Sequence, residues 1–311
     1  MKNEKRLFIP GVLNHCYQNT PNGALIFYSV RDYLVLLSII YIASKRYDVV
    51  LLAVCFMPDH LHSSSVAESL EEFSGFYGFV TSTFAREMNK EYGFRGPVFN
   101  APFGSVPKIG DKKVRTNLIY VYNNPVERRL TAEAEQYRWN FLAYAHNANP
   151  FSEPVVLRHA SSRLRYALKM VDARRAEGKY LTHTLLRNLT APLDGREVRQ
   201  LTDYIITKYS VIRHDEAEKY FGTYEKMLTA IHSTTGSEYD INEVFSGRRD
   251  DVYHKITHIL LHSGRFCSIR DVLQLPEERR KVLANSLYGM TEATYGQILK
   301  YLHLPLSPDR R

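Results

Sequence analysis

The sequence predicts an α+β domain over residues 1–150, followed by a mainly α-helical domain over residues 151–311. Three observations support this division. Strand-like and helix-like patterns alternate in the first half, whereas nearly every patterned segment after residue 158 has helical spacing. Between the two halves, residues 147–158 collect prolines and turn-forming residues, which is typical of a domain boundary.

The strands of the first half are predicted from apolar runs and turn residues. A β-like run over residues 12–20 ends at a Pro-Asn-Gly turn, and residues 49–56 form a nearly continuous apolar run typical of a buried strand. A Met-Pro-Asp break follows, and a short strand restarts at His60. A further short strand is predicted to begin at Val98-Phe99.

Three helices separate or follow these strands. They are predicted over residues 31–46, 69–92 and 111–124, the last ending at Pro125. The second helix carries an aromatic stripe that indicates core packing. The order β-α-β-β-α, with a further strand and helix, predicts a small antiparallel sheet of the ferredoxin-like type.

The second half reads as a series of helices with turn-like gaps at 190–195 and 233–238. The predicted helices cover residues 159–177, 196–208, 215–231, 250–262 and 270–302.

Residues 282–303 have the spacing of a helix-turn-helix, with Thr294 and Gln297 at the start of its recognition helix. An ordinary helical hairpin is the alternative. The inward positions of either arrangement are Ala284, Leu287, Ile298 and Leu302.

Two charged patterns in the second half favour solvated surfaces over a second active site. Residues 247–255 pair opposite charges at a helix start, and His254, His258 and His262 recur every four residues as a surface stripe.

Composition narrows the classes of function. Hydrophobic residues make up 44% and charged residues 24% of the chain, a globular balance, and no apolar run reaches the roughly 18 residues of a membrane span. Three widely spaced cysteines suit reduced thiols, so we expect a cytoplasmic, nucleoid-associated protein with no membrane partner. The net charge of +8 suggests a polyanionic partner, although a soluble protein can simply be basic.

His60 and His62 are the first candidate for chemistry. Alternating strand residues point to the same face, so both imidazoles would face one site while Leu61 faces the core. Such a pair can hold a divalent cation, although a plain polar surface pair is the commoner meaning of this pattern.

Tyr120 is the second candidate, on the predicted helix that ends at Asn124. Asn124 lies one turn further on the same face, where its amide oxygen suits a hard cation such as Mg²⁺ or Mn²⁺. A tyrosine phenolate can form a covalent intermediate. The chain has 22 tyrosines, so Tyr120 stands out only through this context.

Basic and aromatic residues near these positions are candidates for contact with unpaired DNA, or for core packing in the case of the aromatics. The basic candidates are Arg95, Lys112, Lys113 and Arg115, and the aromatic ones are Tyr17, Phe94, Phe99 and Phe103.

Several ordered blocks between residues 11 and 145 resemble the REP-associated group of HUH tyrosine transposases. AVCFMPDHLH resembles that group's Met-Pro-Asn-His-hydrophobic-His block, and LIYVYNNPVERRL its catalytic helix, with Tyr120 in the nucleophile position. HCYQNTPNG, FAREMNKEYGFRGPVFNAPF and YRWNFLAY are similar to its first strand and turn, its helix-turn-strand block and its closing segment.

The resemblance implies a ferredoxin-like core with Mg²⁺ or Mn²⁺ on His60 and His62, Asn124 as a further ligand, and Tyr120 as nucleophile. It implies cleavage and strand transfer of single-stranded or hairpin-flanked DNA through a 5′-phosphotyrosine. One catalytic tyrosine per chain would fit a homodimer in which two copies act together.

The sequence departs from the family pattern at two places. Asp59 replaces the usual Asn, and Ser63-Ser64-Ser65 replaces apolar residues, which weakens the strand's β-propensity and fits a decayed or specialised site.

Three other functions stay open. They are a non-catalytic DNA-binding regulator derived from a transposase, a metal-dependent nuclease that uses water, and a replication initiator with the same chemistry.

Overall fold

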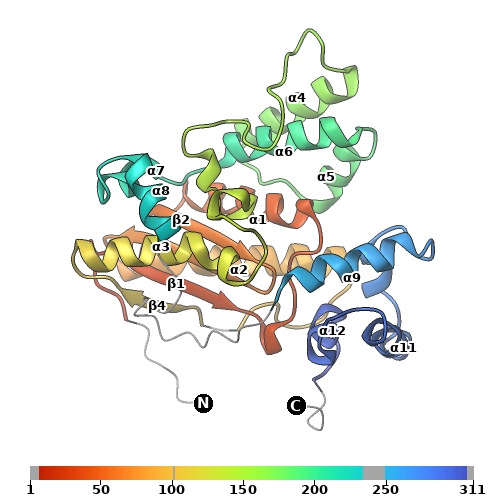
Figure 1. The fold of residues 1–311 in the computed structure, drawn as a ribbon. Coiled ribbons are helices and arrows are strands. Elements are labelled where there is room, and N and C mark those ends of the chain that lie inside the picture. Colours follow the sequence, from red (N-terminus) through yellow and green to blue (C-terminus); the bar gives the residue numbers. More distant parts are fainter. Residues whose placement is uncertain (1–6, 101, 234–248, 307–311) are drawn as a thin grey trace.

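The computed structural model describes residues 7–100, 102–233 and 249–306. It has a four-stranded sheet with many helices around it, which confirms the predicted α+β class (Figure 1). The strands are β1 (Asn14–Asn19), β2 (Val49–Met57), β3 (His60–Ala67) and β4 (Gly104–Pro107). They lie in the order β2-β3-β1-β4, and every neighbouring pair is antiparallel.

Helices cover both faces of this sheet. Helices α1 (Val30–Ala43) and α2 (Leu70–Tyr92) pack against each other, while α3 (Asp111–Glu127) packs on β2 and β3. Successive residues of β3 show the two faces. The hydroxyl of Ser63 contacts Tyr77 of α2, whereas that of Ser64 donates to Asn117 of α3. The face with His60 and His62 is therefore the α3 face.

The ends of α2 illustrate how local sequence sets a helix boundary. The Ser69 hydroxyl accepts a hydrogen bond from the Glu72 backbone N–H at 3.1 Å, which caps the N-terminus. At the other end Gly93 has φ of 73°, the left-handed conformation that glycine adopts without strain. The aromatic stripe between these caps is buried, as predicted.

The predicted strand at Val98-Phe99 is wrong, because the fourth strand starts later, at Gly104. Both residues are buried in an irregular connection. Asn100 anchors this connection to the end of β1, since its backbone N–H donates to the Asn19 carbonyl at 2.8 Å and its amide to the Thr20 carbonyl at 3.1 Å. Side-chain burial here reflects core packing without a strand ladder.

Pro125 does not end α3, contrary to the prediction, because it lies inside the last turn. Proline removes one backbone N–H donor, but near a helix end this costs a single hydrogen bond. The turn is completed by the Arg128 backbone N–H, which donates to the Asn124 carbonyl at 3.1 Å.

The second half is helical, as predicted, with different boundaries. Its helices are α4 (Ser162–Ala176), α5 (His183–Thr190), α6 (Gly195–Tyr209), α7 (His214–Lys219), α8 (Tyr224–Ser233), α9 (Asp251–His262), α10 (Ile269–Leu273), α11 (Glu277–Tyr288) and α12 (Tyr295–Tyr301).

Three boundaries differ from the sequence-based expectation. Helix α5 was not predicted, the predicted helix over 215–231 divides around Gly222, whose φ is 91°, and the helix expected over 270–302 is three helices. Beyond Ser233, the predicted turn at 233–238 lies outside the described residues.

In the described part of the chain, short 3₁₀ turns connect the elements at four places. They are η1 (Pro21–Gly23), η2 (Ala134–Gln136), η3 (Arg138–Asn140) and η4 (Leu142–Tyr144). The segment after α3 packs onto the first half, since the Trp139 ring stacks on that of Tyr33 at 4.1 Å and the Tyr137 hydroxyl donates to the Phe56 carbonyl at 2.7 Å.

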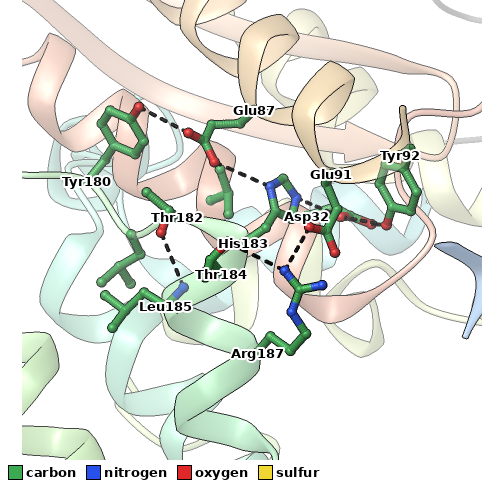
Figure 2. A network of polar contacts seen from close by, with 12 residues as sticks. Asp32, Glu87, Glu91, Tyr92, Tyr180, Thr182, His183, Thr184, Leu185 and Arg187 are labelled. Atoms are coloured by element: carbon green, nitrogen blue, oxygen red, sulfur yellow. Dashed lines mark hydrogen bonds and ion pairs between the residues drawn. The ribbon is translucent and has the colours of Figure 1, made fainter. Parts of the chain in front are cut away.

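Buried apolar side chains from both halves belong to one continuous core. Helices α5 and α6 pack on α1, and the Arg213 backbone N–H donates to the Leu51 carbonyl of β2 at 2.8 Å. A polar network around His183 of α5 also joins the halves (Figure 2). A separate domain at residue 151 therefore stays a prediction. Within the described ranges, every helix is too short or too polar to traverse a lipid bilayer.

Candidate active site

His60 and His62 lie on the same face of β3, where the strand alternation places them. Their ring centroids are 4.8 Å apart and the rings are nearly perpendicular, at 88°. Both side chains are buried, with 6% and 1% of their surface exposed. The pair therefore belongs to an enclosed site, and not to a solvated sheet face as the alternative interpretation required.

Asp59 is the immediate partner of His60. Its carboxylate Oδ1 contacts the imidazole Nδ1 at 2.5 Å. Burial alone would raise the pKa of Asp59, but His60, with Arg128 and Lys300, outweighs it and lowers that pKa. A carboxylate on Nδ1 fixes the orientation of an imidazole whose Nε2 faces a metal. The Asn-to-Asp departure thus gives His60 a charged partner.

His15 of β1 is a third imidazole, which the sequence analysis did not single out. Its Nε2 lies 3.3 Å from Nδ1 of His62, and the two rings stack with centroids 5.2 Å apart. The side chain is 1% exposed. Strand alternation in the sequence puts His15 on one face of β1. The register in which β1 pairs with β3, which brings His15 beside His62, cannot be predicted from a single sequence.

Tyr120, on the helix α3 that covers this face of the sheet, packs against the imidazoles of His62 and His15. Its ring centroid is 5.3 Å from that of His62 and 5.6 Å from that of His15, in edge-on geometry in both cases. The side chain is completely buried. The structure therefore brings Tyr120 and the predicted histidine pair together, although 58 positions in the sequence separate Tyr120 from His62.

A chain of hydrogen bonds runs through the site from β3 to α3 and back. The Ser64 hydroxyl donates to Oδ1 of Asn117 at 2.7 Å, and Nδ2 of Asn117 donates to Nδ1 of His15 at 2.8 Å. Burial, with help from His62 and Lys108, lowers the pKa of His15 well below its usual value, so this ring is neutral near pH 7.

The polarity of this chain determines which nitrogen of His62 carries a proton. A neutral His15 that accepts at Nδ1 has its proton on Nε2, so it donates to Nδ1 of His62 and leaves the proton of a neutral His62 on Nε2. Metal binding at that Nε2 requires the reverse polarity. Turning the Asn117 amide provides it, because the Ser64 hydroxyl can accept as well as donate. The residues therefore fit a metal with one amide rotation.

Asn124 is buried at the C-terminal end of α3, one turn beyond Tyr120. Its side-chain nitrogen has no hydrogen-bond partner among the described residues, and no described contact joins it to the imidazoles. Within the same residues there is no cluster of three or more His, Cys, Asp or Glu side chains arranged to hold a metal ion. A site of two histidines and one amide would contain fewer such side chains, and it stays a prediction.

Ser63, Ser64 and Ser65 do not break β3, which continues to Ala67. All three are buried, and the hydroxyls of Ser63 and Ser65 both contact the Tyr77 hydroxyl, each at 2.7 Å. Satisfied hydroxyls can be buried without the cost of an unpaired polar group. The serines thus form hydrogen bonds from both faces of the strand to the helices that cover it.

Asp250, just before α9, links the C-terminal helices to this site through its contact with Arg128. We expected a solvated helix start here, but Asp250 is 2% exposed and pairs with Arg128 at 3.7 Å. Burial raises the pKa of Asp250 to about 6, and the negative charge of Asp59 adds to this shift. The neighbouring Arg249–Asp251 pair, at 2.7 Å, is the solvated part of this segment.

The predicted DNA-binding cations are spread over two places. Lys112 and Lys113 are exposed on the first turn of α3, where Arg115 is partly buried, and Arg95 is exposed in the connection after α2. No described contact joins Arg95 to the other three. Of the aromatic candidates, Phe99 and Phe103 are buried core residues, while Tyr17 and Phe94 are partly exposed.

Thr294 and Gln297 form a capping box at the start of α12. The Thr294 hydroxyl accepts from the Gln297 backbone N–H at 3.2 Å, and the Gln297 amide accepts from the Thr294 backbone and donates to the Arg249 carbonyl at 2.8 Å. Gln297 is 5% exposed. The four predicted inward positions are indeed buried. The cap accounts for both polar side chains, and DNA contact by either stays a prediction.

No family model and no curated protein matches the chain. Among solved structures, the chain is similar to a REP-associated tyrosine transposase bound to a REP hairpin. The identity is 18%, the match covers 45% of this chain and 81% of that chain, and the TM-score is 0.39. A likeness this distant shows no family, so the function proposed below depends on this chain's own residues.

Proposed function

We propose that this protein cleaves and rejoins single-stranded DNA, with Tyr120 as nucleophile and a divalent cation, Mg²⁺ or Mn²⁺, on His60 and His62. The observation that carries the proposal is the packing of Tyr120 against the imidazole pair, with ring centroids of Tyr120 and His62 5.3 Å apart. The strand order supports a ferredoxin-like core, and the ordered sequence blocks support the transposase class.

Each side chain then has a defined role. Asp59 orients His60 through Nδ1, and with the Asn117 amide turned His15 accepts from Nδ1 of His62, so that Nε2 of both rings would hold the metal. Asn124 is the proposed third ligand. The bound cation would neutralise charge on the phosphate oxygens. The Tyr120 oxygen, having lost its proton, forms the bond to phosphorus, and the bond to the 3′ oxygen breaks.

The leaving strand takes up a proton as a free 3′-hydroxyl, and the 5′-phosphotyrosine conserves the bond energy for a later joining step. An unpaired strand suits this chemistry, because its phosphate can be turned into the site without unstacking a duplex. A single catalytic tyrosine per chain is compatible with two copies that act together.

Burial of Tyr120 requires a change of conformation before DNA can react. The phenol has no solvent-exposed surface, so a phosphodiester cannot reach its oxygen in the conformation described here. This observation also favours a second candidate function, that of a DNA-binding regulator that keeps the fold and does not cleave.

The decisive experiment is covalent capture. The protein is incubated with labelled single-stranded hairpin oligonucleotides and Mn²⁺ or EDTA, and products are separated on denaturing protein gels. We expect a metal-dependent protein–DNA band that Tyr120→Phe abolishes. The matched control is Tyr122→Phe, since Tyr122 is equally buried on the same helix but bonds the Leu52 carbonyl of β2 at 3.3 Å.

The other outcomes separate the alternatives. Cleavage without a covalent band, at the same rate in Tyr120→Phe, would indicate a nuclease that activates water. Binding without cleavage by any oligonucleotide would favour the regulator.

A further inference from the structure

A groove of about 370 Å³ lies where the C-terminal end of the described chain meets the first half. One wall is the turn at 21–24, a second is the connection after α2 over residues 94–98, and the third is formed by residues 300–305. Residues 300–305 lie beyond the blocks that carry the family resemblance, so the C-terminal region completes a groove whose other walls come from the first half.

The lining combines cations, an amide and a stacked aromatic pair. Arg95 is exposed, and no ion pair or hydrogen bond to a described residue engages its guanidinium. Lys300 contributes a second cation, and the Asn89 Oδ1 atom is buried without a hydrogen-bond donor among the described residues. Glu277 also borders the groove, but Lys281 pairs with it at 2.9 Å.

The aromatic pair consists of Phe94 and His303, whose rings stack with centroids 3.9 Å apart at an angle of 14°. Burial lowers the pKa of His303 to about 4, so its ring is uncharged near pH 7. His303 is held in place because its Nε2 contacts the Leu25 carbonyl at 2.7 Å. Flat, uncharged rings beside cations are the chemistry that binds bases and phosphates of unpaired strands.

Lys300 connects the groove with the candidate active site. A Cβ atom added at Gly23 would lie 2.7 Å from the Lys300 ammonium and 3.5 Å from a carboxylate oxygen of Asp59, so both groups border the same glycine. Asp59 in turn holds His60. Lys300 therefore lies between the groove and the carboxylate that holds His60.

We propose that this groove binds an unpaired nucleotide of single-stranded DNA next to the cleaved phosphate, with Arg95 on a phosphate and the Phe94–His303 pair beside a base. The assignment of a cleaved phosphate rests on the proposed function, whereas strand binding in the groove does not.

The test is equilibrium binding in EDTA, which removes catalysis from the readout. Fluorescence anisotropy measures the affinity for a labelled oligothymidylate of about ten nucleotides at several salt concentrations. We expect Arg95→Ala to weaken binding several-fold. Each cation lost from a single-strand contact should also lower the slope of log K against log salt by about 0.7.

Two further variants complete the design. Arg95→Lys should restore the salt slope, because it keeps the charge. Arg279→Ala should bind as wild type does, because Arg279 is an exposed cation of α11 outside the groove.

An unchanged affinity and slope in Arg95→Ala, or no binding of the oligothymidylate by the wild-type protein, would overturn the groove assignment. The covalent capture experiment reports separately on Tyr120. A groove that binds DNA without an adduct would support this inference and contradict the cleavage function.

Discussion

The side chain of Asn117 links the two parts of the candidate site at the scale of single residues. It accepts from Ser64 and donates to His15, which contacts His62. Because its amide has one donor side and one acceptor side, it fixes the polarity of the whole chain of hydrogen bonds. With the amide turned, its oxygen accepts from Nδ1 of His15, and Nε2 of His62 is left for a cation, so the orientation of Asn117 governs cation binding.

We predict that Asn117→Leu, which keeps the side-chain size and removes the amide, lowers the affinity for Mn²⁺ about 10- to 100-fold, the usual effect of losing an outer-shell partner. Isothermal titration calorimetry measures this directly. The control is Thr116→Val on the same helix. The Thr116 hydroxyl donates to the Lys112 carbonyl of its own helix at 2.9 Å, and so takes no part in the candidate site. Equal Mn²⁺ affinity in wild type and Asn117→Leu would remove Asn117 from this role.

His60, His62 and Tyr120 could be predicted from the sequence. The spacing of the two histidines on one strand, the spacing of Tyr120 and Asn124 on one helix, and the blocks that carry the family resemblance are all local properties of the sequence. It could not indicate His15 or Asp250, since each joins the site only through the sheet register or the packing of a distant helix. Asp250 was misread because charged residues are usually exposed, and only a tertiary contact such as Arg128 makes their burial tolerable.

At the scale of elements, two glycines of α2 differ in the space available for a side chain. A Cβ atom at Gly75 would lie 2.4 Å from the ring of Tyr47, whereas one at Gly78 would have nothing within 4 Å. Glycine weakens a helix because of its backbone freedom, so it is retained without cost only where a side chain cannot fit. Gly75 meets this condition, and Gly78 does not.

We predict that Gly78→Ala stabilises the protein by up to about 1 kcal/mol, because it improves helix propensity in open space. Gly75→Ala gains the same propensity but overpacks the Tyr47 contact, and should destabilise by about 1–3 kcal/mol. Urea unfolding followed by circular dichroism compares the two. The same free energy of unfolding for both variants would show that Tyr47 moves aside freely.

Elements with strong patterns could be predicted, and those fixed by tertiary contacts could not. The apolar run of β2 and the aromatic stripe of α2 bury the residues that periodicity identified. Helix α5 was missed because eight residues are too short for a reliable period, and it is stabilised by its Thr182 cap and by the contacts of His183. The late start of β4 follows from the anchoring of Asn100.

For the whole molecule, the network in Figure 2 joins the two halves through buried charges. His183 of α5 contacts Asp32 of α1 at 2.9 Å through Nε2 and Glu87 of α2 at 3.6 Å through Nδ1. Nearby, Arg187 of α5 pairs with Glu91 of α2 at 3.1 Å. Buried carboxylates require such compensation, so the protonated imidazole is part of the attachment of the second half.

The proton on His183 makes this attachment dependent on pH. Burial alone would lower its pKa, but the hydrogen bond to Asp32 and the ion pair with Glu87 outweigh burial and raise the pKa to about 9, from 6.5 in an unfolded chain. The folded state therefore holds the proton more tightly. The resulting stabilisation, on the order of 3 kcal/mol, is complete below about pH 6.5 and is lost as the pH rises through about 9.

We predict that wild type loses this free energy of unfolding between pH 6.5 and 9.5, and that His183→Gln, which carries no titrating group there, loses much less. Urea unfolding at half-unit pH intervals gives the difference, in which the titration of unrelated groups cancels. Thr184→Ala serves as the control, since the neighbouring Thr184 is exposed and should keep the wild-type profile. Parallel profiles for wild type and His183→Gln would mean that His183 is neutral in the folded protein, and that Asp32 and Glu87 are compensated by other groups.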